Sequence, residues 1–241
     1  MPTLSLRIRL AIYRLAQLKT NIVGSLFLSV GAAERHHRHH FFYNAFRALK
    51  FNGIDGDYVE FGVAGAITFA LANSERARHG LKMMLWAFDS FSGLPPQKGQ
   101  EDEHPEWKAG EMLTSQNKFH ALCKKRGIEA DSYKVVPGYY NESLSQPSLL
   151  IATKNIALAY IDCDLYSSTK AVLDFLSTRM KHGMIVAFDD YFCWSSTQIS
   201  GERKALLEFQ EKHPRWNFLP FIQYGWGGMS FVLEDKAPPS S

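Results

Sequence analysis

Hydrophobic positions along the chain follow two periodicities in turn. Short apolar runs rich in β-branched and aromatic residues are separated by segments with the three-to-four residue spacing of a helix. The predicted strands are residues 57–63, 83–89, 132–136, 156–162, 184–188, 216–223 and 229–233. The predicted helices are residues 1–50, 66–79, 116–126, 167–181 and 201–213, with a short helix or loop over 141–150. This alternation is typical of an α/β fold, a doubly wound parallel sheet with helices on both faces.

Three segments refine this prediction. Residues 156–162 (IALAYID) are almost continuously apolar, as expected of a central parallel strand that is covered on both faces. The last two strands are joined by a glycine-containing link without a helix, which predicts a C-terminal antiparallel hairpin. Residues 92–115 are rich in proline, glycine and acidic residues, and a loop of this length is often a lid. We therefore expect an N-terminal helical cap over 1–50, one α/β domain over 51–235 and a tail over 236–241.

Composition excludes several classes of protein. The 241-residue chain has 46% hydrophobic and 21% charged residues, which excludes general disorder, and its net charge of +3 is too weak to indicate nucleic-acid binding. Three separated cysteines without a CxxC pair argue against a disulfide framework and favour reduced thiols in a cytoplasmic protein. The apolar residues 21–33 are too few for the ~20 that a membrane span needs, so no stable membrane insertion is expected.

Polar residues recur where the predicted strands end, which is where ligands bind in such sheets. Glu60 and Gly62 lie in a glycine-containing turn that precedes a helix, an arrangement that exposes backbone N–H groups to a ligand. Asp89 ends the next strand, where an acid can accept hydrogen bonds from ribose hydroxyls. Together they predict a nucleoside-bearing cofactor, without distinguishing S-adenosylmethionine from NAD.

A second group of acids ends two later strands. Asp162 follows one apolar strand, and Asp189 and Asp190 follow the next. If the strands are neighbours, three carboxylates meet, and a hard cation such as magnesium or calcium relieves their repulsion. The alternative is that one acid pairs with an arginine or caps a helix.

Four stretches in this order and spacing resemble one enzyme family. They are YVEFGV (58–63), FDSFSGLP (88–95), IDCDLYSST (161–169) and AFDDY (187–191). They are similar to the TylF/MycF/NovP group of O-methyltransferases, whose namesake is macrocin O-methyltransferase, over about residues 50–234. The resemblance implies the class I methyltransferase (Rossmann-like) fold with seven strands, S-adenosylmethionine and Mg²⁺ as cofactors, and a sugar or other diol-containing small molecule as the methyl acceptor.

The resemblance also implies roles for individual residues. The implied cofactor-binding residues are Glu60, Gly62, Val63, Ala64, Thr68, Asp89, Ser90, Phe91, Gly138, Tyr139 and Tyr140. The implied metal ligands are Asp162, Asp189 and Asp190, and the implied catalytic residues are Asp162 and Asp164.

Two departures from the family pattern leave alternatives open. Residues 64–66 are Ala-Gly-Ala where the family has a bulky residue, a basic residue and glycines. This is the one feature that favours a catalytically silent binding or assembly protein. Leu165 stands where metal-dependent catechol methyltransferases have a lysine base, so that mechanism is not expected. An NAD-dependent oxidoreductase would need a G-x-G-x-x-G turn, which the chain does not have.

Some features of the sequence are not assigned. The histidine cluster at residues 36–40 fits a zinc site less well than a solvated helix face. Trp194 is a minor candidate for stacking on a sugar. The identity of the acceptor and the formation of a homo-oligomer stay open.

Overall fold

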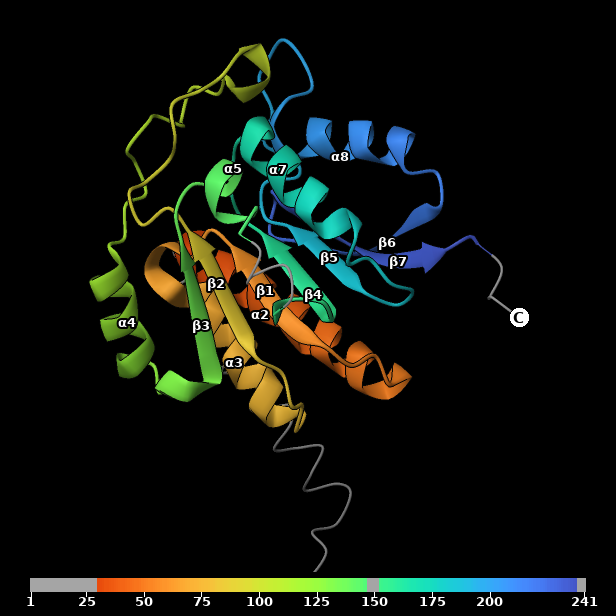
Figure 1. The fold of residues 1–241 in the computed structure, drawn as a ribbon. Helices are drawn as coiled ribbons and strands as arrows, with labels where there is room; N and C mark the ends of the chain where they lie inside the picture. Colours follow the sequence, from red (N-terminus) through yellow and green to blue (C-terminus); the bar gives the residue numbers. More distant parts are fainter. Residues whose placement is uncertain (1–29, 147–151, 238–241) are drawn as a thin grey trace, which may run out of the picture.

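A computed structural model describes residues 30–146 and 152–237. Its centre is a seven-stranded sheet with the order β3-β2-β1-β4-β5-β7-β6, in which the first five strands by sequence pair in parallel and β7 pairs antiparallel with β5 and β6 (Figure 1). This confirms the predicted α/β class and the C-terminal hairpin. The order changes direction between β1 and β4, so the ligand site is expected beyond the ends of these strands.

The elements follow the predicted sequence of strands and helices with small shifts at their ends. The strands are β1 Asp57–Phe61, β2 Leu85–Asp89, β3 Tyr133–Pro137, β4 Ile156–Ile161, β5 Ile185–Phe188, β6 Trp216–Tyr224 and β7 Gly228–Asp235. The α-helices are α2 Val30–Asn52, α3 Ile67–Arg78, α4 Gln116–Lys125, α5 Tyr140–Ser143, α7 Tyr166–Ser177 and α8 Gly201–Lys212. Short 3₁₀ turns cover η1 Ala64–Ala66, η2 Gln100–Asp102 and η3 Ala130–Ser132.

Helices cover both faces of the sheet because neighbouring strand residues point to opposite sides. On one face, Phe61 and Ile161 join a core with residues of α7 and α8 such as Val172. On the other face, Tyr58 and Tyr160 join a core with α2, α3 and α4. All six residues of β4 are buried, as the continuous apolar run predicted.

Helix α2 is integrated into the second core. Phe41, Phe42 and Phe46 have no exposed surface, and the ring of Phe41 stacks on Tyr224 of β6 with a centroid distance of 4.5 Å. The expected boundary after residue 50 therefore falls inside the last turn of α2. Residues 1–29 of the predicted cap, including most of the apolar segment 21–33, lie outside the described residues.

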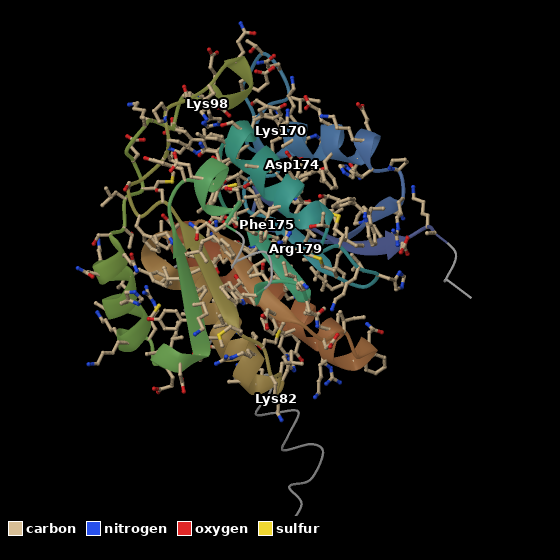
Figure 2. All side chains as sticks on the ribbon, in the orientation of Figure 1. Lys82, Lys98, Lys170, Asp174, Phe175 and Arg179 are labelled. Carbon is tan, nitrogen blue, oxygen red and sulfur yellow. The ribbon has the colours of Figure 1, made fainter. Side chains whose placement is uncertain are left out.

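The loop over residues 92–115 contacts the body of the domain at two buried points. Asp102 accepts hydrogen bonds from the backbone and hydroxyl of Ser167 at the start of α7, both at 2.8 Å. Trp107 packs with Leu165 and Cys193. Lys98 lies on this loop, near the first turns of α7, which carry Lys170 (Figure 2). The predicted loop is thus held against the sheet edge by specific contacts.

One further prediction concerned membranes. Within residues 30–146 and 152–237, no helix combines the length and the apolar character that crossing a bilayer requires.

Candidate active site

A cavity opens beyond the carboxyl ends of the central strands, with an empty volume of about 850 Å³. The cavity is lined by Gly62, Ala64, Asp89, Ser90, Gly93, Leu94, Pro95, Lys98, Met112, Tyr139, Tyr140, Asn141, Asp162, Cys163, Asp164, Ser167, Ser168 and Ala171. Its walls come from four strand ends, the start of α7 and the loop over 92–115.

Gly62 forms the floor of the cavity where β1 ends. Its φ is +91°, and an added Cβ would lie 1.8 Å from the carbonyl oxygen of Asp162. Only glycine permits this approach, which holds the chain after β1 against the chain after β4. The glycine that sequence analysis selected is therefore required by close backbone packing, in addition to any ligand contact.

The turn after Gly62 has two residues in the left-handed region. Gly65 has φ +72° and Ala66 has φ +52°, so one non-glycine residue adopts the left-handed conformation just before α3. The Gly65 N–H donates to the hydroxyl of Thr114 at 3.2 Å, which joins this turn to the end of the loop over 92–115. Sequence analysis missed Thr114, because a threonine at the end of a loop carries no distinguishing pattern.

Asp89 lies on the cavity wall at the end of β2. Its carboxylate accepts the Val63 N–H at 2.8 Å and the Phe91 N–H at 2.7 Å. Burial raises the pKa of Asp89, and the two N–H donors oppose this shift. Each oxygen keeps a free lone pair, so the carboxylate can also accept hydrogen bonds from a ligand.

Glu60 and Thr68 were expected at the cofactor and do not line the cavity. Glu60 is completely buried, and it accepts hydrogen bonds from the Tyr58 hydroxyl and from the Thr68 hydroxyl, the latter at 2.5 Å. Burial raises the pKa of Glu60 to about 8, although both hydroxyl donors favour the ionised form. These contacts stabilise the turn between β1 and α3 from its buried side, because Glu60 lies on β1 and Thr68 lies in the first turn of α3.

Three other expected cofactor residues also point elsewhere. The Val63 side chain is buried, and Phe91 packs on Phe119 with a centroid distance of 5.8 Å. Gly138 is not among the lining residues, and its N–H donates to the Asp89 carbonyl at 2.9 Å. The following residues Tyr139 and Tyr140 do line the cavity, as does Ser90.

Three carboxyl groups meet beside the cavity, which two of them, Asp162 and Asp164, line. Asp162, Asp164 and Asp190 each offer an oxygen, and these oxygens all lie within 4.8 Å of one another. Burial, followed by the neighbouring acids, raises the pKa of Asp162 and of Asp190 well above the usual range. Burial, followed by the charge of Asp162, raises the pKa of Asp164 to about 7. Such a group of oxygen ligands fits a hard divalent cation.

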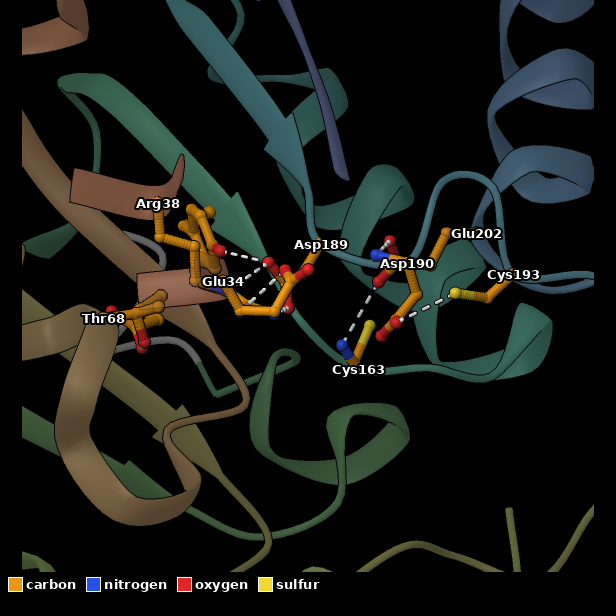
Figure 3. A network of polar contacts seen from close by, with 10 residues as sticks. Glu34, Arg38, Thr68, Cys163, Asp189, Asp190, Cys193 and Glu202 are labelled. Atoms are coloured by element: carbon orange, nitrogen blue, oxygen red, sulfur yellow. Dashed lines mark hydrogen bonds and ion pairs between the residues drawn. The ribbon is translucent and has the colours of Figure 1, made fainter. Parts of the chain in front are cut away.

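Asp189, a predicted metal ligand, is not part of this group and lies against α2 instead. Its carboxylate receives two hydrogen bonds from Arg38 of α2, from Nε at 2.9 Å and from Nη2 at 2.5 Å, and one from the Tyr160 hydroxyl. Asp189 and Asp190 point to opposite sides of the chain that follows β5 (Figure 3). Asp189 and Asp190 lie in the turn that follows β5, and the third acid of the group is Asp164, on the turn after β4.

Sequence analysis also missed two charged residues that organise these acids. Arg38 forms the ion pair with Asp189, and its Nη1 lies 3.5 Å from Oε2 of Glu34 on the same helix. Glu202 is completely buried in the first turn of α8 and accepts the N–H groups of Cys163 and Asp190 (Figure 3). Arg38 lies 151 residues before Asp189, and Glu202 lies on a helix 12 residues after Asp190, so no local spacing indicated them.

The fold and the cavity together define a class I methyltransferase architecture. Strands β1 to β5 pair in parallel, β7 pairs antiparallel with β5 and β6, and the cavity lies where the strand order changes direction. A model of the macrocin O-methyltransferase family (TylF) matches residues 32–215. The chain belongs to this family.

Two curated relatives come from Streptomyces. The 8-demethyl-8-(2,3-dimethoxy-alpha-L-rhamnosyl)-tetracenomycin-C 4'-O-methyltransferase of Streptomyces olivaceus is 27% identical over 147 residues, and the demethyldecarbamoylnovobiocin O-methyltransferase of Streptomyces niveus is 26% identical over 146 residues. Each match covers 58% of this chain and 54% of the relative, so the similarity spans about half of the relatives' length.

Solved structures share the fold at low identity. The calicheamicin methyltransferase CalS11 has a TM-score of 0.68 and 20% identity, over 96% of this chain and 95% of its own. The O-methyltransferase NovP has a TM-score of 0.65 and 20% identity, over 81% and 79%. A Bacillus cereus O-methyltransferase in complex with SAH has a TM-score of 0.52 and 12% identity, over 89% and 97%.

Proposed function

We propose that the protein transfers the methyl group of S-adenosylmethionine to a hydroxyl of a sugar or other diol-bearing small molecule, with a divalent cation, Mg²⁺ by preference, at the acid group. The observation that carries this proposal is the meeting of Asp162, Asp164 and Asp190 at the side of the cavity that Asp89 also lines. Family membership supports the reaction. Both Streptomyces relatives are named O-methyltransferases, and the name of the Streptomyces olivaceus enzyme includes a rhamnosyl group.

The cavity residues suit a nucleoside-bearing ligand such as S-adenosylmethionine. Asp89 has free lone pairs for ribose hydroxyls, and Tyr139 and Tyr140 offer aromatic surface beside it. Gly62 and Ala64 leave the backbone accessible at the end of β1. We propose that Glu60 and Thr68 act indirectly, by holding this turn in place.

The acid group is proposed to prepare the acceptor hydroxyl. A cation held by Asp162 and Asp190 would orient two neighbouring hydroxyls and lower the pKa of the attacking one. Asp164, which lines the cavity two residues after Asp162, is the proposed acceptor of the hydroxyl proton. The expected ligand Asp189 becomes available only when Arg38 releases it. Alignment of oxygen, methyl and sulfur in one line then favours transfer.

Calorimetry tests the cofactor first. The protein is expected to bind S-adenosylmethionine and S-adenosylhomocysteine, and Asp89→Asn is expected to weaken both. A protein that binds neither would instead support the catalytically silent alternative, which the Ala64–Ala66 turn suggested.

Turnover tests the acceptor and the cation. The relatives' names mention rhamnosyl groups and a TDP-rhamnose substrate, so the first panel is a rhamnoside and a nucleoside diphosphate rhamnose. Methyl transfer is expected with Mg²⁺ and is expected to stop in chelator. Full transfer in chelator would remove the cation from the mechanism.

A further inference from the structure

Glu202 is a buried carboxylate outside the cavity that no expectation covers. It has no exposed surface, and it lies in the first turn of α8, where the residue is neither part of a strand nor in reach of the predicted cofactor turn. Burial, followed by the charge of Asp190, raises its pKa well above the usual range. A carboxyl group in such surroundings is costly to bury, so its contacts require an explanation.

Its two oxygens bridge the ends of two strands. The β4–β5 ladder ends with the Asp189 N–H donating to the Ile161 carbonyl at 2.8 Å. Beyond that bond, Glu202 Oε1 accepts the Cys163 N–H at 3.3 Å and Oε2 accepts the Asp190 N–H at 3.0 Å. The carboxylate therefore continues the connection between the strands after their direct pairing has ended.

The bridged backbone positions carry the acid group. Cys163 stands between Asp162 and Asp164, and Asp164 has φ +61°, a left-handed conformation that is unfavourable for a residue with a side chain. The Leu165 N–H donates to the Cys163 carbonyl at 2.6 Å, so this turn is tight. An anchor on the Cys163 N–H opposes relaxation of the turn, and the same anchor fixes the backbone of Asp190.

We propose that Glu202 is a positioning residue, which sets the separation of the Asp162–Asp164 turn from Asp190 and thereby the affinity of the acid group for a divalent cation. This inference rests on the cation of the proposed function. Two backbone donors require two acceptor oxygens, which a carboxylate supplies and a glutamine amide does not. Residues that orient metal ligands typically change metal affinity by about 10–100-fold when they are replaced.

Two substitutions disturb the bridge in different ways. Glu202→Gln keeps the shape and removes one acceptor and the charge, whereas Glu202→Asp keeps both acceptors and the charge on a shorter side chain. Glu208→Gln is the matched control, because Glu208 lies on the same helix and binds the Tyr166 hydroxyl at 2.7 Å, away from the acid group. Mn²⁺ is the probe, and its dissociation constant is measured by electron paramagnetic resonance on the full chain.

Both Glu202 variants are expected to bind Mn²⁺ about 10–100-fold more weakly, and Glu208→Gln as tightly as the wild type. S-adenosylhomocysteine affinity is expected to stay within about twofold in all three, because Glu202 does not line the cavity; a general loss of structure would lower it as well. The Cys163 and Asp190 amides are expected to exchange hydrogen faster in both Glu202 variants. If Glu202→Gln does not fold, Glu202→Asp carries the test.

A folded Glu202 variant that binds Mn²⁺ as tightly as the wild type would overturn the positioning role of Glu202 and leave the proposed function unaffected. Absence of Mn²⁺ binding by the wild-type protein would instead refute the cation of the proposed function, and the positioning role of Glu202 with it. The two failures are therefore distinguishable.

Discussion

Asp189 and Asp190 are neighbours in sequence and have opposite surroundings. Asp189 faces α2, where Arg38 and Tyr160 satisfy its carboxylate. Asp190 faces Asp162 and Asp164, and its side chain receives a hydrogen bond from the Cys193 thiol at 3.2 Å. The protein thus neutralises one acid with a guanidinium and groups the other with further acids.

The different surroundings of Asp189 and Asp190 distinguish an acid that is already paired within the protein from an acid that is available to a ligand. A buried ion pair with good geometry needs no further partner. Grouped acids raise one another's pKa and remain ready to bind a proton or a cation. A third acid, Glu60, represents another solution, because burial and two hydroxyl donors surround it without a cation.

The largest expected effect concerns Glu60 and pH. Its pKa is about 8 in the folded protein and 4.5 ordinarily, so the folded state binds more protons between these values and stability falls as pH rises through this window. At about 1.4 kcal/mol per pKa unit, the loss between pH 5 and 8 is roughly 4 kcal/mol at most. Glu60→Gln is expected to lose this dependence, measured by urea unfolding across the window. Parallel pH curves for the two proteins would contradict the raised pKa.

The second-largest expected effect comes from removal of the ion pair between Arg38 and Asp189. Arg38→Met leaves the buried Asp189 carboxylate without its positively charged partner. We expect the free energy of unfolding to fall by roughly 3 kcal/mol, the lower end of the range for a buried pair, because the Arg38 side chain is 26% exposed. Arg47→Met is the control on the same helix, with an expected change within about 0.5 kcal/mol because Arg47 is exposed. Equal urea midpoints for the two variants would show that the pair contributes little.

The smallest effect has the opposite sign. In chelator, Asp190→Asn is expected to raise the free energy of unfolding by about 1 kcal/mol, because one acid leaves a group of mutually repelling carboxyls. Added Mg²⁺ is expected to raise the melting temperature of the wild type and not that of the variant. Asp174→Asn, on the exposed face of α7, serves as the control and should melt like the wild type. A destabilised Asp190→Asn protein in chelator would argue against repulsion within the group.

The fold was predictable from the sequence because its signals are local. The continuous apolar run of β4 and the glycine link of the hairpin each indicate their element without outside information. The acids at Asp162 and Asp190 were also predictable, since parallel strand ends meet at one sheet edge. The role of Asp189 was not, because its partner Arg38 lies 151 residues away on a helix whose packing the pattern does not reveal. Glu202 lies on a later helix, and no local spacing linked it to the acids. Glu60 was predicted to bind the cofactor, because a buried strand residue and a cavity residue have the same periodicity.

The central claim is that Asp162 and Asp190 form a divalent cation site beside the cofactor cavity. The most direct test is Mn²⁺ binding to the wild-type protein and to Asp162→Asn, followed by electron paramagnetic resonance. We expect one Mn²⁺ per wild-type chain and at least about tenfold weaker binding in the variant. Equal affinity in the two proteins, or no binding by the wild type, would contradict the claim.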